Sequence, residues 1–381
     1  MPEISVQVHP PGRPAIPQMD TIRVLAMLGV FLHHLWKAIM LHPQGALQWG
    51  LDVLFSASSD GVVLFNILSG FLLALPYLGD ERRPFIGYRH FLDKRFLRII
   101  PPYYIALLLF SFWNVQAFGI PPGSALHTLL LHMFFVNSFS YSLMATNFSH
   151  FWYLGMLAHF YLLFPLILRL FQRAGPMRAT VLIIAFCWGG WGLLALYLSA
   201  NPDSALGMAG YLVHFNVPGR LPEFAIGMWL ASVWSPAASS LRERAVDRPF
   251  LLFIISMIVY LMLTGPFVRT MNLPLTHIYH VALCVVFMVF MVFWAPVARV
   301  GRSGPVKLVS GLSYAIYIVH EPLTSYIGVM PGKVPGNMGA FLGYLVILLP
   351  LSCIGAKAIN WLAASIMRRI GGRTAVSPSI P

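Results

Sequence analysis

Long apolar runs recur along almost the whole chain and restrict what it can fold into. Ten segments of about 18–24 residues are dominated by hydrophobic side chains, and this length crosses the hydrocarbon core of a bilayer as an α-helix. Hydrophobic residues make up 58% of the 381 residues and charged residues only 10%, whereas soluble domains contain about 25% charged residues. We therefore predict an all-α, polytopic transmembrane helix bundle with about ten spans: 22–41, 61–78, 99–118, 151–168, 179–198, 211–234, 250–267, 276–297, 308–327 and 339–361.

The rest of the chain forms short tails and connections. Residues 1–18 contain five prolines and are predicted to be a disordered cytoplasmic tail, followed by one transmembrane domain over 19–367 and a cytoplasmic tail over 368–381. The first apolar segment begins late and lacks a small-residue cleavage site, which favours a retained helix over a signal peptide. Segment 124–139 is too short to span and is expected to be a re-entrant or surface helix.

The distribution of lysine and arginine predicts the topology. The N-terminal tail, the C-terminal tail and the even-numbered connections hold 19 of the 25 cations, whereas the odd-numbered connections hold two, Arg269 and Lys333. By the positive-inside rule both termini are cytoplasmic, and we expect a multi-pass protein of the inner (cytoplasmic) membrane. The net charge of +13 therefore follows from topology and is not read as a nucleic-acid-binding signal.

Two ionisable residues of the first segment share one face of the expected helix. Arg23 and His34 are eleven residues apart, which corresponds to three turns plus about 20° and to about 16 Å along the axis. His33 points about 80° away from that face. Ionisable side chains in a bilayer cost several kcal/mol, so each is a candidate for function. The structural alternative is that Arg23 snorkels to headgroups and His34 hydrogen-bonds a neighbouring helix.

The second and third segments add a hydroxyl and two cations. Ser69 and Gly70 form a small pair, which is typical of close helix packing, although the hydroxyl could also serve a substrate oxygen. Arg95 and Arg98 lie one turn apart at the cytoplasmic entrance of the third segment. Ordinary anchoring explains them, but the i,i+3 spacing also suits a two-pronged clamp for the phosphates of a cytoplasmic nucleotide or coenzyme.

Later segments carry further polar residues. Glu223 is an acid within an apolar segment, and Arg220 precedes it by one turn, so a structural ion pair is the alternative to a functional role. His320 and Glu321 are expected near the outer surface, where Pro322 follows.

No metal site is predicted. His277 and His280 have i,i+3 spacing, but no acid or cysteine is near them in the sequence, and they are interpreted as interfacial or packing residues. The three cysteines lie inside apolar runs, which indicates neither a disulfide framework nor a thiolate zinc site.

Taken in order, these motifs resemble the membrane-bound acyltransferase-3 family, and the resemblance covers about 19–361. Its members are bacterial integral-membrane enzymes that O-acylate glycans, lipids, antibiotics and other metabolites. No single motif is specific, but six in the right order are. They are Arg23 to His34; Leu64 to Phe71 (LFNILSGF); Arg95 to Pro101 (RFLRIIP); Phe160 to Pro165 (FYLLFP); Glu223 to Met228 (EFAIGM); and Leu312 to His320 (LSYAIYIVH).

Two departures from the family pattern affect the expected site. Many members have carboxylates before the fourth segment, where this chain reads WYLGMLAHFY over 152–161. The acid expected to pair with His34 is therefore missing, and His159 is one conceivable polar substitute. The aspartate usually found two positions after the glycine of the second segment is Val63 here, and Asp60 precedes that glycine instead.

The resemblance implies transfer of a short acyl group, such as acetyl, from cytoplasmic acyl-CoA to a hydroxyl of a glycan, lipid or secondary metabolite. We expect no permanently bound cofactor. Arg95 and Arg98 would bind the coenzyme, His34 would act as general base or acyl carrier, and Ser69 or Arg23 would serve the oxyanion. Glu223 is a further candidate. The alternative function is a transporter or flippase, because intramembrane His, Arg and Glu also line substrate pathways.

Overall fold

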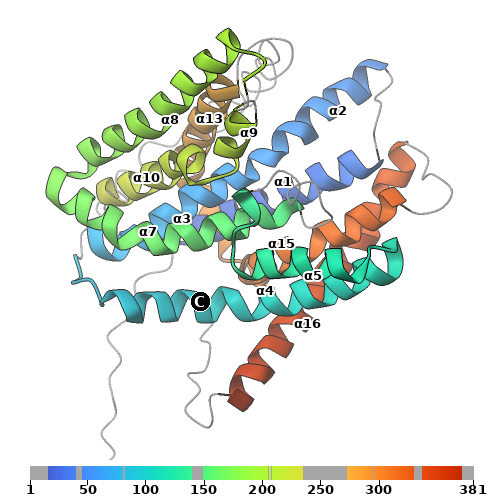
Figure 1. Ribbon diagram of the computed structural model, residues 1–381. Helices are drawn as coiled ribbons and strands as arrows, with labels where there is room; N and C mark the ends of the chain where they lie inside the picture. The colour runs from blue at the N-terminus through green and yellow to red at the C-terminus, as the bar shows by residue number, and fades with distance from the viewer. Residues whose placement is uncertain are drawn as a thin grey trace, which may run out of the picture.

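The computed structural model describes nine ranges of the chain, and all regular structure within them is helical (Figure 1). No strand occurs in these ranges, which confirms the all-α prediction. The N-terminal residues 1–15, the expected span 250–267 and residues 371–381 lie outside the described residues. The described ranges are 16–39, 45–79, 82–139, 149–204, 206, 208–234, 273–293, 295–329 and 337–370.

The elements follow the apolar pattern, with short 3₁₀ turns (η) between some helices. In chain order they are α1 (Pro17–Ile39), α2 (Gly45–Ala57), η1 (Ser58–Asp60), α3 (Gly61–Leu78), α4 (Tyr88–Phe118), α5 (Pro122–Met133), η2 (Asn137–Phe139), η3 (Ser149–Phe151), α7 (Trp152–Ala174), α8 (Pro176–Ala200), α9 (Ala209–His214), α10 (Val217–Val233), α13 (Leu273–Phe293), α14 (Ala295–Gly301), α15 (Gly304–Val329) and α16 (Met338–Ile370).

Seven described helical stretches are long and apolar enough to cross a membrane: α1, the joined α2–α3 run, α4, α7, α8, α13 and α16. This indicates a multi-pass membrane protein. The other three expected spans are not confirmed. Segment 211–234 is divided between α9 and α10, 308–327 forms α15 but is less apolar, and 250–267 is outside the described residues. The short segment 124–139 contains α5 and η2.

α3 lies near the centre of the bundle and packs closely against α10. A Cβ on Gly70 would lie 2.0 Å from the carbonyl oxygen of Phe224, and a Cβ on Gly227 would lie 2.0 Å from that of Ile67. The two glycines therefore allow reciprocal backbone contact, as small residues do between membrane helices. This fixes the register in which Glu223 of α10 meets Asn66 of α3.

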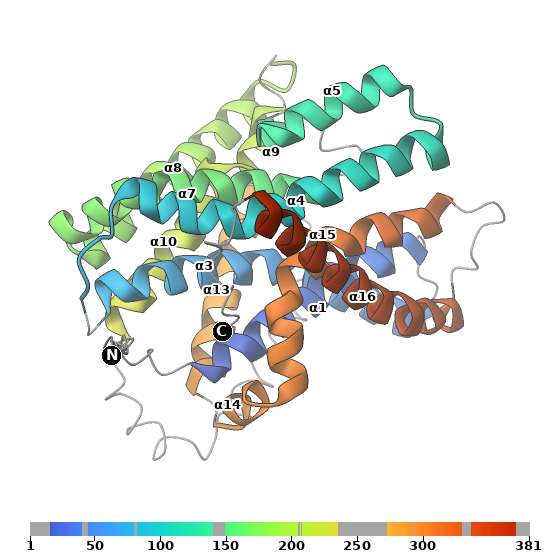
Figure 2. The ribbon, with the colours of Figure 1, turned by 90° about the horizontal axis from the view of Figure 1, so that it is seen from below.

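Two long helices, α8 and α16, lie on separate sides of the bundle (Figure 2), and both carry exposed apolar side chains. Phe186 is 84% exposed on α8, and Val346 and Trp361 are 73% and 68% exposed on α16. Exposed apolar side chains of this size on spanning helices suit contact with lipid tails.

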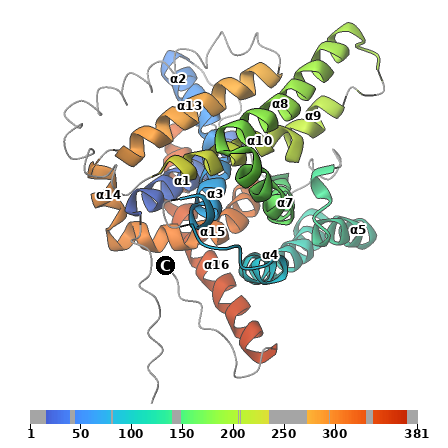
Figure 3. The same ribbon diagram turned by 90° about the vertical axis from the view of Figure 1, so that its left-hand side faces the viewer.

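α13 and the α4–α5 pair lie on opposite sides of the central helices α1, α3 and α15 (Figure 3). The site described below is assembled within this central group, with α13 as one wall.

Candidate functional site

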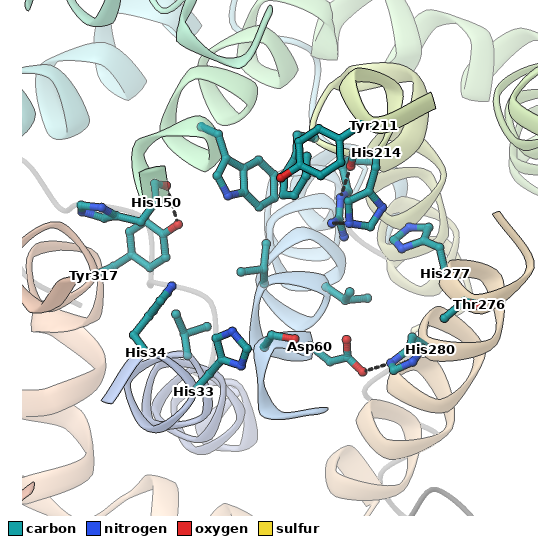
Figure 4. Close-up of a pocket in the computed structure, with 17 residues that line it drawn as sticks. His33, His34, Asp60, His150, Tyr211, His214, Thr276, His277, His280 and Tyr317 are labelled. Carbon is teal, nitrogen blue, oxygen red and sulfur yellow. Dashed lines mark hydrogen bonds and ion pairs between the residues drawn. The ribbon is translucent and has the colours of Figure 1, made fainter. Parts of the chain in front are cut away.

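A cavity of about 440 Å³ lies where α1, α3, α13, α15 and the α9–α10 segment meet (Figure 4). Its lining is rich in imidazole side chains, which come from helices far apart in the sequence. The polar residues that line it are His33, His34, Ser59, Asp60, His150, Trp152, Tyr211, His214, Arg220, Thr276, His277, His280 and Tyr317.

His34 enters this cavity from α1, and its orientation is set by α15. The Nδ1 atom of His34 lies 2.9 Å from Nε2 of His320. His320 Nδ1 lies 2.7 Å from the carbonyl oxygen of Tyr317, and because a carbonyl only accepts, His320 must donate from Nδ1. A neutral His320 then accepts at Nε2, so His34 donates from Nδ1 and carries its lone pair on Nε2.

Glu321 supplies the carboxylate that the fourth segment lacks. Its Oε2 lies 3.9 Å from His34 Nε2 and 2.6 Å from His150 Nδ1, and it accepts the backbone N–H of His150 at 3.0 Å. His150 donates from Nε2 to the carbonyl of Ile318. A positive charge that forms on His34 therefore has a carboxylate within ion-pair distance.

The α10 side of the cavity contains a buried ion-pair network. Arg220 Nη1 lies 2.9 Å from Glu223 Oε1, and Asn66 donates to Glu223 Oε2 at 2.6 Å. His277 Nε2 lies 2.9 Å from Glu223 Oε1, and Arg220 donates to His214 Nε2 at 2.8 Å. The ion pair expected for Glu223 is thus present. Glu223 is fully buried behind Arg220, which lines the cavity.

Asp60 and His280 face the cavity from the η1–α3 junction and from α13 (Figure 4). Asp60 Oδ2 lies 2.5 Å from His280 Nδ1. The interpretation of His277 and His280 as packing residues without an acid nearby fails because their acids, Glu223 and Asp60, come from other helices.

Arg23 lies at the other end of the contact between α1 and α15. It donates to Ser310 Oγ at 2.9 Å and lies 3.3 Å from Asp20 Oδ1, while Ser310 donates to the same carboxylate at 2.6 Å. Arg23 contacts α15 at residue 310 and His34 contacts it at 320, so the two helices run parallel. This confirms that Arg23 and His34 share one helix face. His33 instead donates to the carbonyl of Phe55 at 3.1 Å.

Arg95 and Arg98 of α4 belong to the same electrostatic group as Arg23. The charges of all three arginines act on the buried side chain of Tyr161 in α7, and Arg98 and Arg23 repel one another. Arg98 is exposed, and Arg95 lies over the ring of Phe91 at 5.7 Å. None of the three lines the cavity, so cations and imidazoles form two separate groups.

Ser69 contacts Tyr153, a buried tyrosine of α7. Its hydroxyl forms a side-chain hydrogen bond with Tyr153, and Tyr153 also interacts electrostatically with Tyr161. The Tyr153 ring lies 5.2 Å from that of Tyr317, a residue of the cavity wall. Ser69 itself is not part of the cavity lining.

Other residues of interest have clear positions. His159 packs against Phe139 with ring centroids 5.5 Å apart and does not line the cavity, so it does not reach His34. Among the described residues, no three His, Cys, Asp or Glu side chains are grouped closely enough to hold a metal ion.

The fold and the cavity define a helical membrane protein with a histidine-rich internal site. Residues 16–357 match the acyltransferase-3 family, described as an acyltransferase domain (Acyl_transf_3), and the chain belongs to this family.

The chain is similar in sequence to proteins of Staphylococcus aureus. The chain is 22% identical over 400 aligned positions to the protein named "Putative O-acetyltransferase SACOL0978" of strain COL, covering 96% of this chain and 62% of that protein. It is 24% identical over 239 positions to "O-acetyltransferase OatA" of strain NCTC 8325, covering 58% and 35%. The chain therefore spans less than two thirds of the length of either relative. No solved structure gives a significant match.

Proposed function

We propose that this chain is an integral-membrane O-acyltransferase that moves a short acyl group, such as acetyl, from cytoplasmic acyl-CoA to a hydroxyl of a glycan, lipid or secondary metabolite. Family membership and the names of the relatives support acyl transfer to oxygen. The donor, the acceptor class and the inner-membrane location are part of the proposal.

The orientation of His34 is the observation that carries it. The hydrogen-bond chain from Tyr317 through His320 leaves the basic nitrogen of His34 as Nε2, close to Glu321 and facing the cavity. A nitrogen held this way can take the proton of an acceptor hydroxyl or attack a thioester carbonyl. In either role Glu321 stabilises the cation that forms on His34.

The arginine group would bind the donor. The charges of Arg23, Arg95 and Arg98 all act on Tyr161, and a group of positive charges suits the phosphates of a coenzyme. With both termini and the connection before α4 in the cytoplasm, as the positive-inside rule predicts, this group would face the cytoplasmic pool of acyl-CoA. The same topology implies about ten spans, with cytoplasmic tails at both ends of a single domain over 19–367.

Glu223 is best explained as a positioning residue. Its carboxylate neutralises Arg220 and contacts His277, and both partners line the cavity. Breaking a buried ion pair of this kind typically costs about 3–5 kcal/mol.

Thioester consumption by the purified protein tests the proposed function directly. Acetyl-CoA is supplied with hydroxyl probes such as glucose, glycerol and octyl glucoside, and both free CoA thiol and acetylated probe are measured. We expect CoA release that depends on the probe and is lost in His34→Ala. If no probe supports CoA release, while reconstituted vesicles move a hydroxylated solute across the bilayer, a transporter explains the site better.

A further inference from the structure

The Asp60–His280 pair joins two elements that are 220 residues apart and places a second held imidazole on the cavity. Asp60 Oδ2 contacts His280 Nδ1 at 2.5 Å. The two side chains are only 17% and 16% exposed. Both line the cavity, and His280 lies on the side opposite His34 and Tyr317 (Figure 4).

His34 and His280 differ in what supports Nδ1. The partner of His34 is the imidazole of His320 at 2.9 Å, and its nearest carboxylate oxygen is 3.9 Å away on Glu321, which also contacts His150. The partner of His280 is a carboxylate in direct contact. An imidazole that accepts a proton at Nε2 becomes a cation, and an adjacent carboxylate stabilises that cation more than a neutral imidazole does. His280 is therefore the stronger proton acceptor of the two.

We propose that His280, oriented by Asp60, takes the proton of the acceptor hydroxyl, while His34 carries the acyl group. This inference rests on the proposed acyltransferase function and decides between the two roles open to His34. His280 becomes a catalytic residue of the acceptor half-reaction, and Asp60 becomes its positioning residue.

The two half-reactions balance as follows. His34 Nε2 attacks the thioester carbonyl, so an N–C bond forms, the C–S bond breaks and CoA leaves as the thiolate. The acceptor hydroxyl then passes its proton to His280 Nε2, and its oxygen attacks the acyl carbon. The O–C bond forms, the N–C bond breaks and His34 returns to the neutral state. The proton on His280 is finally released and balances the protonation of the CoA thiolate.

The arrangement of the helices keeps the two substrates apart. Two of the cations proposed to bind the donor belong to α4, whereas His280 belongs to α13, on the opposite side of the central helices (Figure 3). The donor and the acceptor can therefore approach His34 from different directions.

Isotope exchange measures acyl transfer to His34 separately from acyl transfer to the acceptor, and it does not require the natural acceptor to be known. Labelled CoA is incubated with unlabelled acetyl-CoA and the purified protein, and label appears in acetyl-CoA only if acyl transfer to the enzyme is reversible. Acetylation of glycerol and hydrolysis by water report the second half. We expect the parent protein to catalyse exchange without glycerol and His34→Ala to lose both exchange and transfer.

Variants of the pair should affect the second half alone. His280→Ala and Asp60→Asn should retain exchange within about twofold but lose at least about 100-fold in acetylation of glycerol, the usual scale for removing a general base. Added imidazole should restore part of the transfer in His280→Ala but none in Asp60→Asn, which keeps its imidazole. Val286→Ala, on an exposed position of the same helix, should leave exchange and transfer unchanged.

Three results would overturn the assignment. A parent protein that acetylates glycerol but shows no exchange would make His34 a base and not a carrier. Wild-type transfer in His280→Ala would remove His280 from the reaction. Loss of exchange together with transfer, a lowered melting temperature and no imidazole rescue would make the pair a structural clamp. A parent protein without either reaction would instead refute the proposed function itself.

Discussion

The two ends of the contact between α1 and α15 use different chemistry for residues that lie on the same helix face. At one end, Arg23 is held by Ser310 and Asp20 and lies near Arg98, so this end carries permanent charge. At the other end, His34 is held by the imidazole of His320. Permanent cations suit binding of phosphates, whereas imidazoles can gain and lose protons near neutral pH. The comparison predicts that mutations at the imidazole end change kcat and mutations at the arginine end change KM.

The largest effect is expected at His34. His34→Ala should lower kcat for acyl transfer by about 10²–10⁴-fold, because the nitrogen that reacts is removed. His33→Ala, which removes a neighbouring imidazole turned toward Phe55, should cost much less. Transfer rates at saturating acetyl-CoA measure both, with membrane insertion checked in parallel. Equal activity of His34→Ala and the parent protein would remove the distinction between the two ends.

Within the contact between α1 and α15, Glu321→Gln should have the next largest effect. The side chain keeps its size and can still accept hydrogen bonds, but the charge 3.9 Å from His34 Nε2 is lost. We expect kcat to fall by about 10–100-fold, within the range for loss of one electrostatic stabiliser, with KM for acyl-CoA nearly unchanged. A rise in KM without a fall in kcat would place Glu321 in donor binding.

Arg95→Lys and Arg98→Lys test the arginine end. Each variant keeps the charge that determines topology but loses the planar guanidinium fork, so KM for acyl-CoA should rise by about 5–20-fold, which corresponds to about 1–2 kcal/mol. kcat should change little. Arg82→Lys, on an exposed residue before α4, is the matched control. Unchanged KM in both α4 variants would leave these arginines as membrane anchors.

Ser69→Ala should have a small effect. Its hydroxyl interacts with Tyr153 and lies outside the cavity lining, so kcat should fall by less than about threefold. A donor to the oxyanion would cost about 10²–10³-fold. Steady-state transfer rates of Ser69→Ala therefore decide whether Ser69 only contacts Tyr153 or donates a hydrogen bond to the oxyanion.

The topology test should leave activity unaltered while deciding which end faces the cytoplasm. In a variant without Cys187, Cys284 and Cys353, we expect Ser124→Cys to react with an impermeant maleimide on intact cells and Tyr88→Cys to react only after lysis. Tyr88 is preferable to Gly87, because Gly87 has a φ of 91° that disfavours a side chain. Labelling of Tyr88→Cys from outside would contradict cytoplasmic binding of acyl-CoA.

Local spacing was sufficient to predict the shared face of Arg23 and His34, because eleven residues return a helix to nearly the same direction. The seven candidate spans could also be predicted locally, because each is a long apolar stretch of the sequence. The ion pair of Arg220 and Glu223 also follows from i,i+3 spacing.

The partners of the histidines could not be predicted in this way. His34 meets His320 across 286 residues and His280 meets Asp60 across 220, and helix periodicity carries no information about which faces of separate helices pack together. The one feature of the sequence that pointed to such a partner was Asp60, an acid at a different position from the family's usual aspartate. In the absence of the usual aspartate at position 63, an acid three residues earlier would need a partner elsewhere.

The parallel contact of α1 with α15 has a consequence for the choice of donor. Both side chains of α1 are held by α15, and the rise of α1 separates Arg23 from His34 by about 16 Å. A donor that contacts both residues must therefore have about this length. A donor whose acyl carbonyl hangs at the end of a long flexible arm can place its phosphates at one end and its carbonyl at the other. Acetyl phosphate, whose carbonyl adjoins the phosphate, is too short to do both and should be rejected.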